Sequence, residues 1–170
     1  MEPVVSPERP IRAALLTIST TRARERGADD PGGDELFRWA GELDAEVVER
    51  EIVPDTRGLI EDRIRHFADA VGCDLVLTTG GTGFAPDDVT PEATLGVADR
   101  IAPGIAEAMR LASREHTDRW MLSRNVAAIR GATLIVNFPG SPRAIGEAGE
   151  AIAAALPHAV ALLRVERPGH

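Results

Sequence analysis

The stretch LVLTTGGTGFAPDDVTPEAT, residues 75–94, predicts a strand, a glycine-rich bend and a helix start in direct succession. Residues 75–79 are apolar or β-branched, which is typical of a central strand covered on both faces. Three glycines follow within four residues, then the adjacent carboxylates of Asp87 and Asp88, then Thr90-Pro91. Glycines remove side chains from a bend, so that successive backbone N–H groups can point at an anion. The stretch therefore predicts an anion-binding loop at the edge of a sheet.

Strand and helix patterns alternate through the rest of the chain. The expected elements are strands at 11–19, 45–53 and 75–79, helices at 34–43 and within 57–71, short helices opened by Thr90-Pro91 and Pro103-Gly104, a strand–turn–strand unit within 124–140, and a last helix capped by Ser141-Pro142. Asp34 is the expected N-cap of its helix, and the charged segment 20–33 is an expected loop. Such βαβ units predict a three-layer α/β/α sandwich with a mostly parallel sheet. The strand pair that turns at Arg130-Gly131 makes this sheet mixed.

Length and composition restrict the class of protein. A chain of 170 residues that is 44% hydrophobic fits one domain, which we place at 11–164 between a disordered tail at 1–10 and a tail at 165–170. The net charge of −8 disfavours a nucleic-acid or membrane-surface partner. All 19 basic residues are arginine, so a P-loop lysine and a Schiff-base lysine are excluded. The N-terminal segment does not resemble a signal peptide, so we expect a cytoplasmic location.

Ligands of open α/β sheets bind at the carboxyl ends of the strands, and three such ends carry small polar residues. Their candidate substrate-binding residues are Thr17, Ser19 and Thr20 after the first strand, Thr79, Gly80, Gly81, Thr82 and Gly83 after the third, and Gly140, Ser141 and Pro142 after the last. The glycine loop fits neither the dinucleotide fingerprint nor the P-loop. An ordinary strand-to-helix turn is the alternative interpretation of these glycines.

Carboxylates beside a phosphate site repel the phosphate unless a cation lies between them. Asp55 follows the second strand and Asp88 follows the glycine loop, so both are candidate catalytic residues and Mg²⁺ ligands. Asp55 has a structural alternative, because it could cap the helix that follows it. For the neighbouring Asp87, a solvated loop charge is the favoured interpretation. Thr90 is a further substrate-binding candidate that could instead cap the helix at Pro91.

The motifs TTGGTG and DVTPEA, with IVPD upstream and LSR and PGSP downstream, resemble those of the MoaB/Mog family of molybdenum cofactor biosynthesis, in the same order from about Ile11 to Arg164. The helical segment that begins TPEATLGV is similar to the molybdopterin adenylyltransferase branch. The resemblance implies a homotrimer that binds molybdopterin and ATP. It also implies Mg²⁺-dependent transfer of AMP from ATP to the terminal phosphate of molybdopterin, with release of pyrophosphate. A downstream molybdenum-insertion protein would then collect the product.

By position in these motifs, Asp55 and Asp88 match the functional aspartates of the family and residues 79–83 match its phosphate loop. Ser123 of LSR matches a pterin-side position, and the residues named above after the first and last strands match the other two ligand loops. Asp87 departs from the family pattern, because arginine is common there. The first loop also departs from the family pattern. TISTTR lacks the aspartate that frequently follows the serine, and DPGG replaces the more usual D-x-S-G. A non-catalytic molybdopterin-binding paralogue or carrier is therefore the alternative function.

Overall fold

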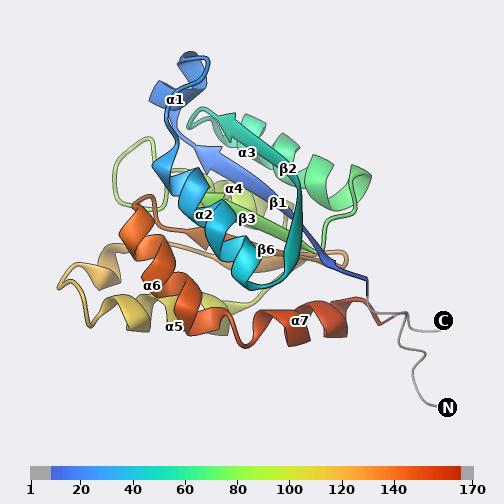
Figure 1. Cartoon of the computed structure of the whole chain (residues 1–170). Coiled ribbons are helices and arrows are strands. Elements are labelled where there is room, and N and C mark those ends of the chain that lie inside the picture. Colours follow the sequence, from blue (N-terminus) through green and yellow to red (C-terminus); the bar gives the residue numbers. More distant parts are fainter. Residues whose placement is uncertain (1–8, 166–170) are drawn as a thin grey trace, which may run out of the picture.

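β3 (Leu75–Thr79) is an inner strand of a six-stranded sheet with the order β2-β1-β3-β6-β5-β4. The computed structural model describes residues 9–165 (Figure 1). The parallel strands are β1 (Ile11–Ile18), β2 (Ala45–Val53), β3 and β6 (Thr133–Phe138), and the antiparallel ones are β5 (Ala127–Arg130) and β4 (Arg100–Ile101). All five residues of β3 are buried, as an apolar strand covered on both faces requires. The predicted mostly parallel, mixed sheet is confirmed.

Helices cover both faces of this sheet, which confirms the three-layer prediction (Figure 1). One face carries α3 (Arg57–Arg65) and α4 (Thr90–Val97), and the other carries α2 (Pro31–Glu42), α5 (Pro103–Ser113), α6 (Pro142–Ile152) and α7 (Leu156–Leu163). Successive side chains of a strand point to opposite faces. Leu75 and Leu77 accordingly pack under α2 and α6, whereas Val76 packs under α3 and α4.

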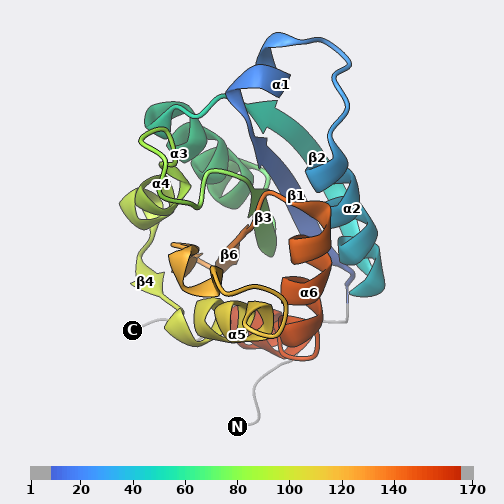
Figure 2. The same ribbon diagram turned by 90° about the vertical axis from the view of Figure 1, so that its left-hand side faces the viewer.

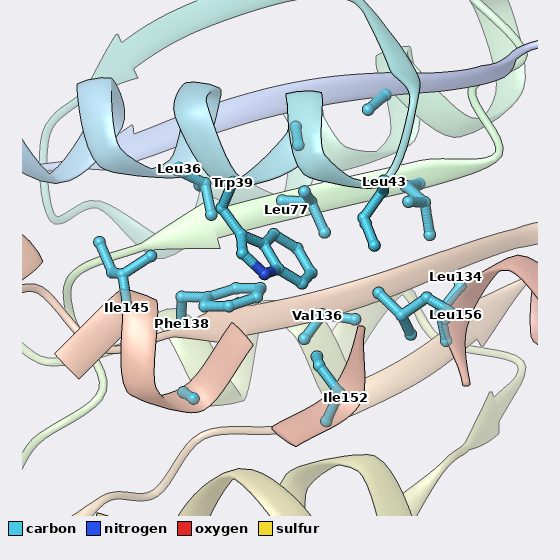
Figure 3. Packing of buried hydrophobic residues seen from close by; sticks show 14 of the residues in the cluster. Leu36, Trp39, Leu43, Leu77, Leu134, Val136, Phe138, Ile145, Ile152 and Leu156 are labelled. Carbon is cyan, nitrogen blue, oxygen red and sulfur yellow. The ribbon is translucent and has the colours of Figure 1, made fainter. Parts of the chain in front are cut away.

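Trp39 of α2 is a large, fully buried side chain of the core. Its indole lies on the ring of Phe138 at the end of β6, with ring centroids 4.9 Å apart (Figure 3). Gly149 of α6 leaves room for this ring system, because a β-carbon at Gly149 would overlap the indole nitrogen. The contact fixes α2 and α6 over the end of β6, where the chain passes into Pro139-Gly140.

The first long helix begins at Pro31, so the prediction that Asp34 caps it is wrong. Asp30 is the N-cap, and its carboxylate accepts hydrogen bonds from Gly33 N at 3.0 Å and Thr17 Oγ1 at 2.8 Å. Proline is favourable at the first helical position because its missing N–H would have no intrahelical partner there. The two buried hydrogen bonds of Asp30 outweigh the weaker cap signal at Asp34, which is exposed.

Smaller elements also differ from the prediction. A short helix, α1 (Thr20–Arg24), lies in the predicted loop 20–33, because Ser19 caps it through a hydrogen bond from Arg22 N. The end of the helix within 57–71 forms a π-helical turn at His66–Ala70. The predicted last helix is divided into α6 and α7, and β4 adds two residues to the sheet edge. A short 3-10 turn spans Trp120–Leu122.

The predicted tails lie mainly at residues 1–8 and 166–170, outside the described part of the chain. Arg9 and Pro10, which fall within the predicted tail 1–10, are held against the domain by hydrogen bonds to Arg164 and Asp74. Within residues 9–165, no helix combines the length and the apolar composition needed to cross a bilayer.

Asp74 joins three parts of the chain at the edge where the parallel strands begin. Its side chain is 4% exposed and forms paired hydrogen bonds with Arg9, at 2.9 and 2.9 Å, and with Arg164, at 3.0 and 2.7 Å. It also accepts the backbone N–H of Arg12 at 2.8 Å. Burial raises the pKa of Asp74, but the hydrogen bonds from Arg164, Arg12 and Arg9 bring it below its usual value.

We expect Asp74→Asn to lower the free energy of unfolding at pH 7 by about 2 kcal/mol, because the buried side chain loses the negative charge and one of the two acceptor oxygens that pair with Arg9 and Arg164. The folded-state pKa is depressed, so this stabilisation is present above the unfolded-state pKa of about 3.9 and is lost as the pH falls through the folded-state value. Urea unfolding of wild type and Asp74→Asn at pH 7 and at progressively lower pH measures the difference in their free energies of unfolding. This difference should become smaller as the pH falls.

Asp69→Asn is the matched control, since Asp69 also pairs with an arginine, Arg130, but is 53% exposed. Its effect should stay below about 1 kcal/mol. Equal losses in the two variants, or a loss at Asp74 that does not change with pH, would contradict this account.

Candidate active site

The carboxyl ends of β1, β3 and β6 lie side by side at one edge of the sheet. Thr17 of β1 pairs with Thr79 of β3, and Thr79 pairs with Phe138 of β6. The arrowheads of β1 and β2 point toward this edge in Figure 1, and Figure 2 looks onto it. The three loops that the sequence singled out therefore start from adjacent positions.

The glycine loop, residues 79–83, bends sharply as it leaves β3. Gly80 and Gly81 have φ angles of +94° and +68°, which residues with a β-carbon rarely adopt. A β-carbon on Gly80 would also overlap the carbonyl oxygen of Ile18, so the loop lies directly against the end of β1. Thr90 holds the bend from the other side, because its Oγ1 donates to Gly80 O at 2.9 Å and its N–H to Gly81 O at 3.1 Å.

Thr90 is fully buried and is the first residue of α4, whose N-cap is Val89. The alternative that Thr90 caps this helix is therefore wrong. Its hydroxyl shapes the glycine loop, which places α4 immediately behind the bend. A helix start in this position adds partial positive charge to the N–H groups of the loop.

Asp55 is held by the first loop and not by the helix that follows it. The N-cap of α3 is Thr56, so the capping alternative for Asp55 is wrong. One oxygen of Asp55, Oδ2, accepts the N–H of Thr20 at 2.9 Å and its hydroxyl at 2.8 Å. The other oxygen, Oδ1, faces the glycine loop, since it lies 3.4 Å from where a β-carbon on Gly81 would be.

Asp88 lies at the far end of the same loop. Its Oδ2 accepts the N–H of Ala85 at 3.0 Å, and a β-carbon on Gly83 would lie 2.8 Å from that oxygen. Asp87 is exposed, which agrees with its interpretation as a solvated loop charge. The glycine loop thus has one carboxylate near Gly81 and another near Gly83.

This donor set fits Mg²⁺, which takes one or two carboxylates and completes its shell with substrate phosphates and water. Residues 9–165 contain no group of three or more acidic, histidine or cysteine side chains that could hold a metal ion by itself. A cation at Asp55 and Asp88 would consequently depend on a phosphate ligand to complete its coordination.

The other predicted residues at the ends of β1 and β3 mostly form hydrogen bonds that hold the loops in place. Thr17 binds the helix cap Asp30, and Thr82 is buried and accepts the N–H of Arg124 through its carbonyl at 2.8 Å. Thr79 Oγ1 donates to Pro139 O at 2.7 Å, which ties the glycine loop to the loop after β6.

The loop after β6 comes close to the glycine loop. A β-carbon on Gly140 would lie 3.7 Å from the α-carbon of Gly80. Ser141 caps α6 by accepting Ala144 N at 3.2 Å, with Pro142 as the first helical residue, as predicted. All three residues are exposed and remain accessible to a ligand.

Ser123 lies beside a hollow of about 140 Å³ that opens next to the loop after β6. Its lining includes Arg110, Trp120, Ser123, Asn125 and Pro139. Ser123 Oγ donates to Asn125 Oδ1 at 3.1 Å, and Arg110 donates to the carbonyl and side-chain oxygens of Asn125 at 2.9 and 2.7 Å. The hollow therefore offers polar and cationic groups together with an aromatic wall.

Sequence reasoning did not select Arg110, Asn125 or Arg124. Arg110 and Asn125 are 15 residues apart and meet only through the packing of α5 against the segment before β5. Arg124 contacts Gly83 across 41 positions of sequence. Its place in the LSR motif, next to Ser123, was the available signal.

Comparison with known proteins accounts for this arrangement. Residues 14–158 match the family described as a probable molybdopterin binding domain. The chain belongs to this family of molybdenum cofactor biosynthesis. The predicted membership in the MoaB/Mog family is thereby confirmed.

Three relatives with names from molybdenum cofactor biosynthesis are similar to this chain over most of its length. A protein from Haemophilus influenzae named molybdopterin adenylyltransferase is 43% identical over 145 residues, which cover 82% of this chain and 74% of that protein. The adenylyltransferase of Escherichia coli K12 is 42% identical over 84% of this chain and 73% of its own length. The molybdenum cofactor synthesis protein cinnamon of Drosophila melanogaster is 42% identical over 90% of this chain, which spans only 26% of that protein.

Among solved structures, the molybdopterin biosynthesis enzyme MoaB from Thermus thermophilus has a TM-score of 0.85 and 42% identity to this chain. The superposition covers 92% of this chain and 98% of that one. The family domain therefore extends over nearly all of the described residues.

We expect Gly81→Ala to lower the free energy of unfolding by about 3 kcal/mol, because its β-carbon would overlap Thr90 Oγ1 in addition to straining the backbone. Gly131→Ala is the matched control. Gly131 has a φ of +56° but open space around it, so only the strain of about 1 kcal/mol remains. Urea unfolding measures both, and equal losses would show that Gly81 is not packed against Thr90.

Proposed function

We propose that this chain is a molybdopterin adenylyltransferase, which transfers AMP from ATP to the terminal phosphate of molybdopterin and releases pyrophosphate. One observation carries the proposal: a glycine-rich anion loop has Asp55 beside Gly81 and Asp88 beside Gly83. Relatives with this name are 42% and 43% identical over most of the chain, which supports the same reaction here.

The N–H groups of the glycine loop and the start of α6 would bind the phosphates of the two substrates, and the start of α4 behind the loop would add partial positive charge. An oxygen of the terminal molybdopterin phosphate then attacks the α-phosphorus of ATP. A new P–O bond forms while the bond to pyrophosphate breaks. The attacking phosphate is already ionised at neutral pH, so the reaction needs no general base. Positioning and charge stabilisation supply most of the catalysis in such transfers.

Asp55 and Asp88 are the residues that would hold Mg²⁺. When bound, the ion would supply positive charge to the phosphate oxygens. Thr20 would keep Asp55 in place through its two hydrogen bonds, so that Oδ1 continues to face the glycine loop. Ser123 and the hollow beside it would take the pterin side of molybdopterin, close enough to the loop after β6 for the phosphate to reach the glycine loop.

We expect Asp88→Asn to slow pyrophosphate release by about 100-fold while the affinity for molybdopterin changes less than about threefold. The carboxylate would hold the cation that stabilises negative charge at the reacting phosphates, whereas the pterin would bind elsewhere. Turnover is measured with molybdopterin, ATP and Mg²⁺, and binding is measured by calorimetry without ATP.

Asp62→Asn provides the control for this measurement, because Asp62 is exposed on α3. It should leave both quantities unchanged. A normal rate in Asp88→Asn would remove Asp88 from the reaction.

A non-catalytic molybdopterin-binding protein of the same pathway is the second candidate. Asp87 favours it, since an exposed anion next to the glycine loop opposes the approach of ATP phosphates. A wild-type protein that binds molybdopterin but releases no pyrophosphate would establish this alternative.

Assembly and location extend the proposal. Large apolar side chains are exposed on the chain, among them Phe84, Ile101, Met121 and Leu162, but the trimer itself is proposed from the resemblance to the family. We expect a homotrimer, so light scattering should give three times the 18.1 kDa mass of the chain. A monomeric mass at micromolar concentration would contradict the trimer. A cytoplasmic location and a downstream molybdenum-insertion partner complete the proposed role.

A further inference from the structure

Arg124 is the residue that connects the two ends of the candidate active site. Its Nε donates to Gly83 O at 2.7 Å and its Nη2 to Asp88 O at 2.6 Å, while Nη1 forms an ion pair with Glu92 of α4. The N–H of Arg124 also donates to Thr82 O at 2.8 Å. One side chain thus spans the segment from the carbonyl of Gly83 to the backbone carbonyl of Asp88.

The neighbours of Arg124 face the other substrate. Ser123 and Asn125 line the hollow and are hydrogen-bonded to each other, and Arg110 donates to Asn125. Three consecutive residues therefore alternate between the hollow and the glycine loop. A ligand that fixes Ser123 and Asn125 would also fix the backbone from which Arg124 extends.

We propose that Arg124 is a positioning residue that holds Asp88 and residues 83–88 in place, and that makes this placement depend on occupancy of the hollow. The inference rests on the proposed function for its substrates, with the pterin of molybdopterin in the hollow and the phosphates of molybdopterin and ATP at the glycine loop. Arg124 itself contacts protein groups, and it acts on the reaction through Asp88.

The chemistry of the guanidinium explains why arginine suits this place. Its planar fork presents donors in several fixed directions, whereas the ammonium group of lysine is a single compact donor on a flexible chain. Both carbonyl acceptors, Gly83 O and Asp88 O, would lose charge-assisted hydrogen bonds in Arg124→Lys, although the positive charge would remain. The hydrogen bond from Arg124 also lowers the pKa of Glu92, which agrees with an ion pair that holds α4 to this segment.

The experiment compares wild type with Arg124→Lys by hydrogen exchange and by steady-state kinetics. Without ligand, the hydrogen-bonded amides of this segment, Ala85 N–H and Asp88 N–H, should exchange at least about tenfold faster in the variant, because the segment opens more easily without the Arg124 hydrogen bonds. Added molybdopterin should slow this exchange in wild type by a larger factor than in the variant, which keeps only the direct contact of the molybdopterin phosphate with the glycine loop. The kcat for pyrophosphate release should fall at least about tenfold, with the KM for molybdopterin changed less than about threefold.

Arg130→Lys is the matched control. Arg130 also binds a carboxylate, Asp69, and a backbone carbonyl, Val97 O at 2.9 Å, and its side chain is 25% exposed against 33% for Arg124. It lies at the opposite edge of the sheet, where β5 turns into β6. Its replacement should leave kcat and the exchange of residues 83–88 at wild-type values. Glu92→Gln, which weakens the anchor of Arg124 without replacing it, should shift both readouts in the same direction by a smaller factor.

The outcomes separate this inference from the proposed function. If wild type releases pyrophosphate and Arg124→Lys has the same kcat and exchange as Arg130→Lys, the role of Arg124 is overturned and the proposed function is unaffected. Wild type that neither binds molybdopterin nor releases pyrophosphate overturns the function and the dependence on the hollow. Amide hydrogen exchange measured without ligand then still tests whether Arg124 holds residues 83–88. Unchanged exchange in both Arg124→Lys and Glu92→Gln would show that Arg124 does not hold them.

Discussion

The close approach of Gly80 to the carbonyl oxygen of Ile18 determines how the ligand edge of this domain is built. No β-carbon fits between them, so the end of β3 lies against the end of β1 and the bend points outward from the sheet. Thr90 then binds the bend from behind and Thr79 binds the loop after β6. Backbone N–H groups, helix starts and two carboxylates converge because these short contacts leave the chain little other room.

Buried polar side chains maintain this edge without taking part in the chemistry. Asn137 of β6 is fully buried, and its amide donates to Thr78 at 3.0 Å and Thr94 at 2.9 Å while its oxygen accepts Val126 N. It therefore connects β3, α4 and the segment before β5 in one satisfied network. Such a network specifies a single arrangement, since every alternative would leave a buried polar group unpaired.

Local patterns in the sequence predicted the sheet well and the polar connections less well. The apolar residues 75–79 and the proline at the start of α4 are local signals, and both elements lie where expected. The N-cap of α2 was misplaced by four residues because the deciding contact, Thr17 to Asp30, joins a strand to a loop. Asp55 and Asp88 were selected as candidates from their positions after strand ends and from family motifs, whereas the contacts of Arg110 and Arg124 are tertiary and no periodicity reveals them.

The Asp74 cluster has a consequence for how this domain can be combined with others. Arg9 and Arg164 meet there, so the polypeptide enters and leaves at neighbouring points on the side remote from the glycine loop. Other domains joined to the chain near Arg9 or Arg164 would attach on this side of the domain and not beside the glycine loop. A domain of this kind also forms part of a much longer polypeptide, since the similar stretch makes up about a quarter of the Drosophila protein.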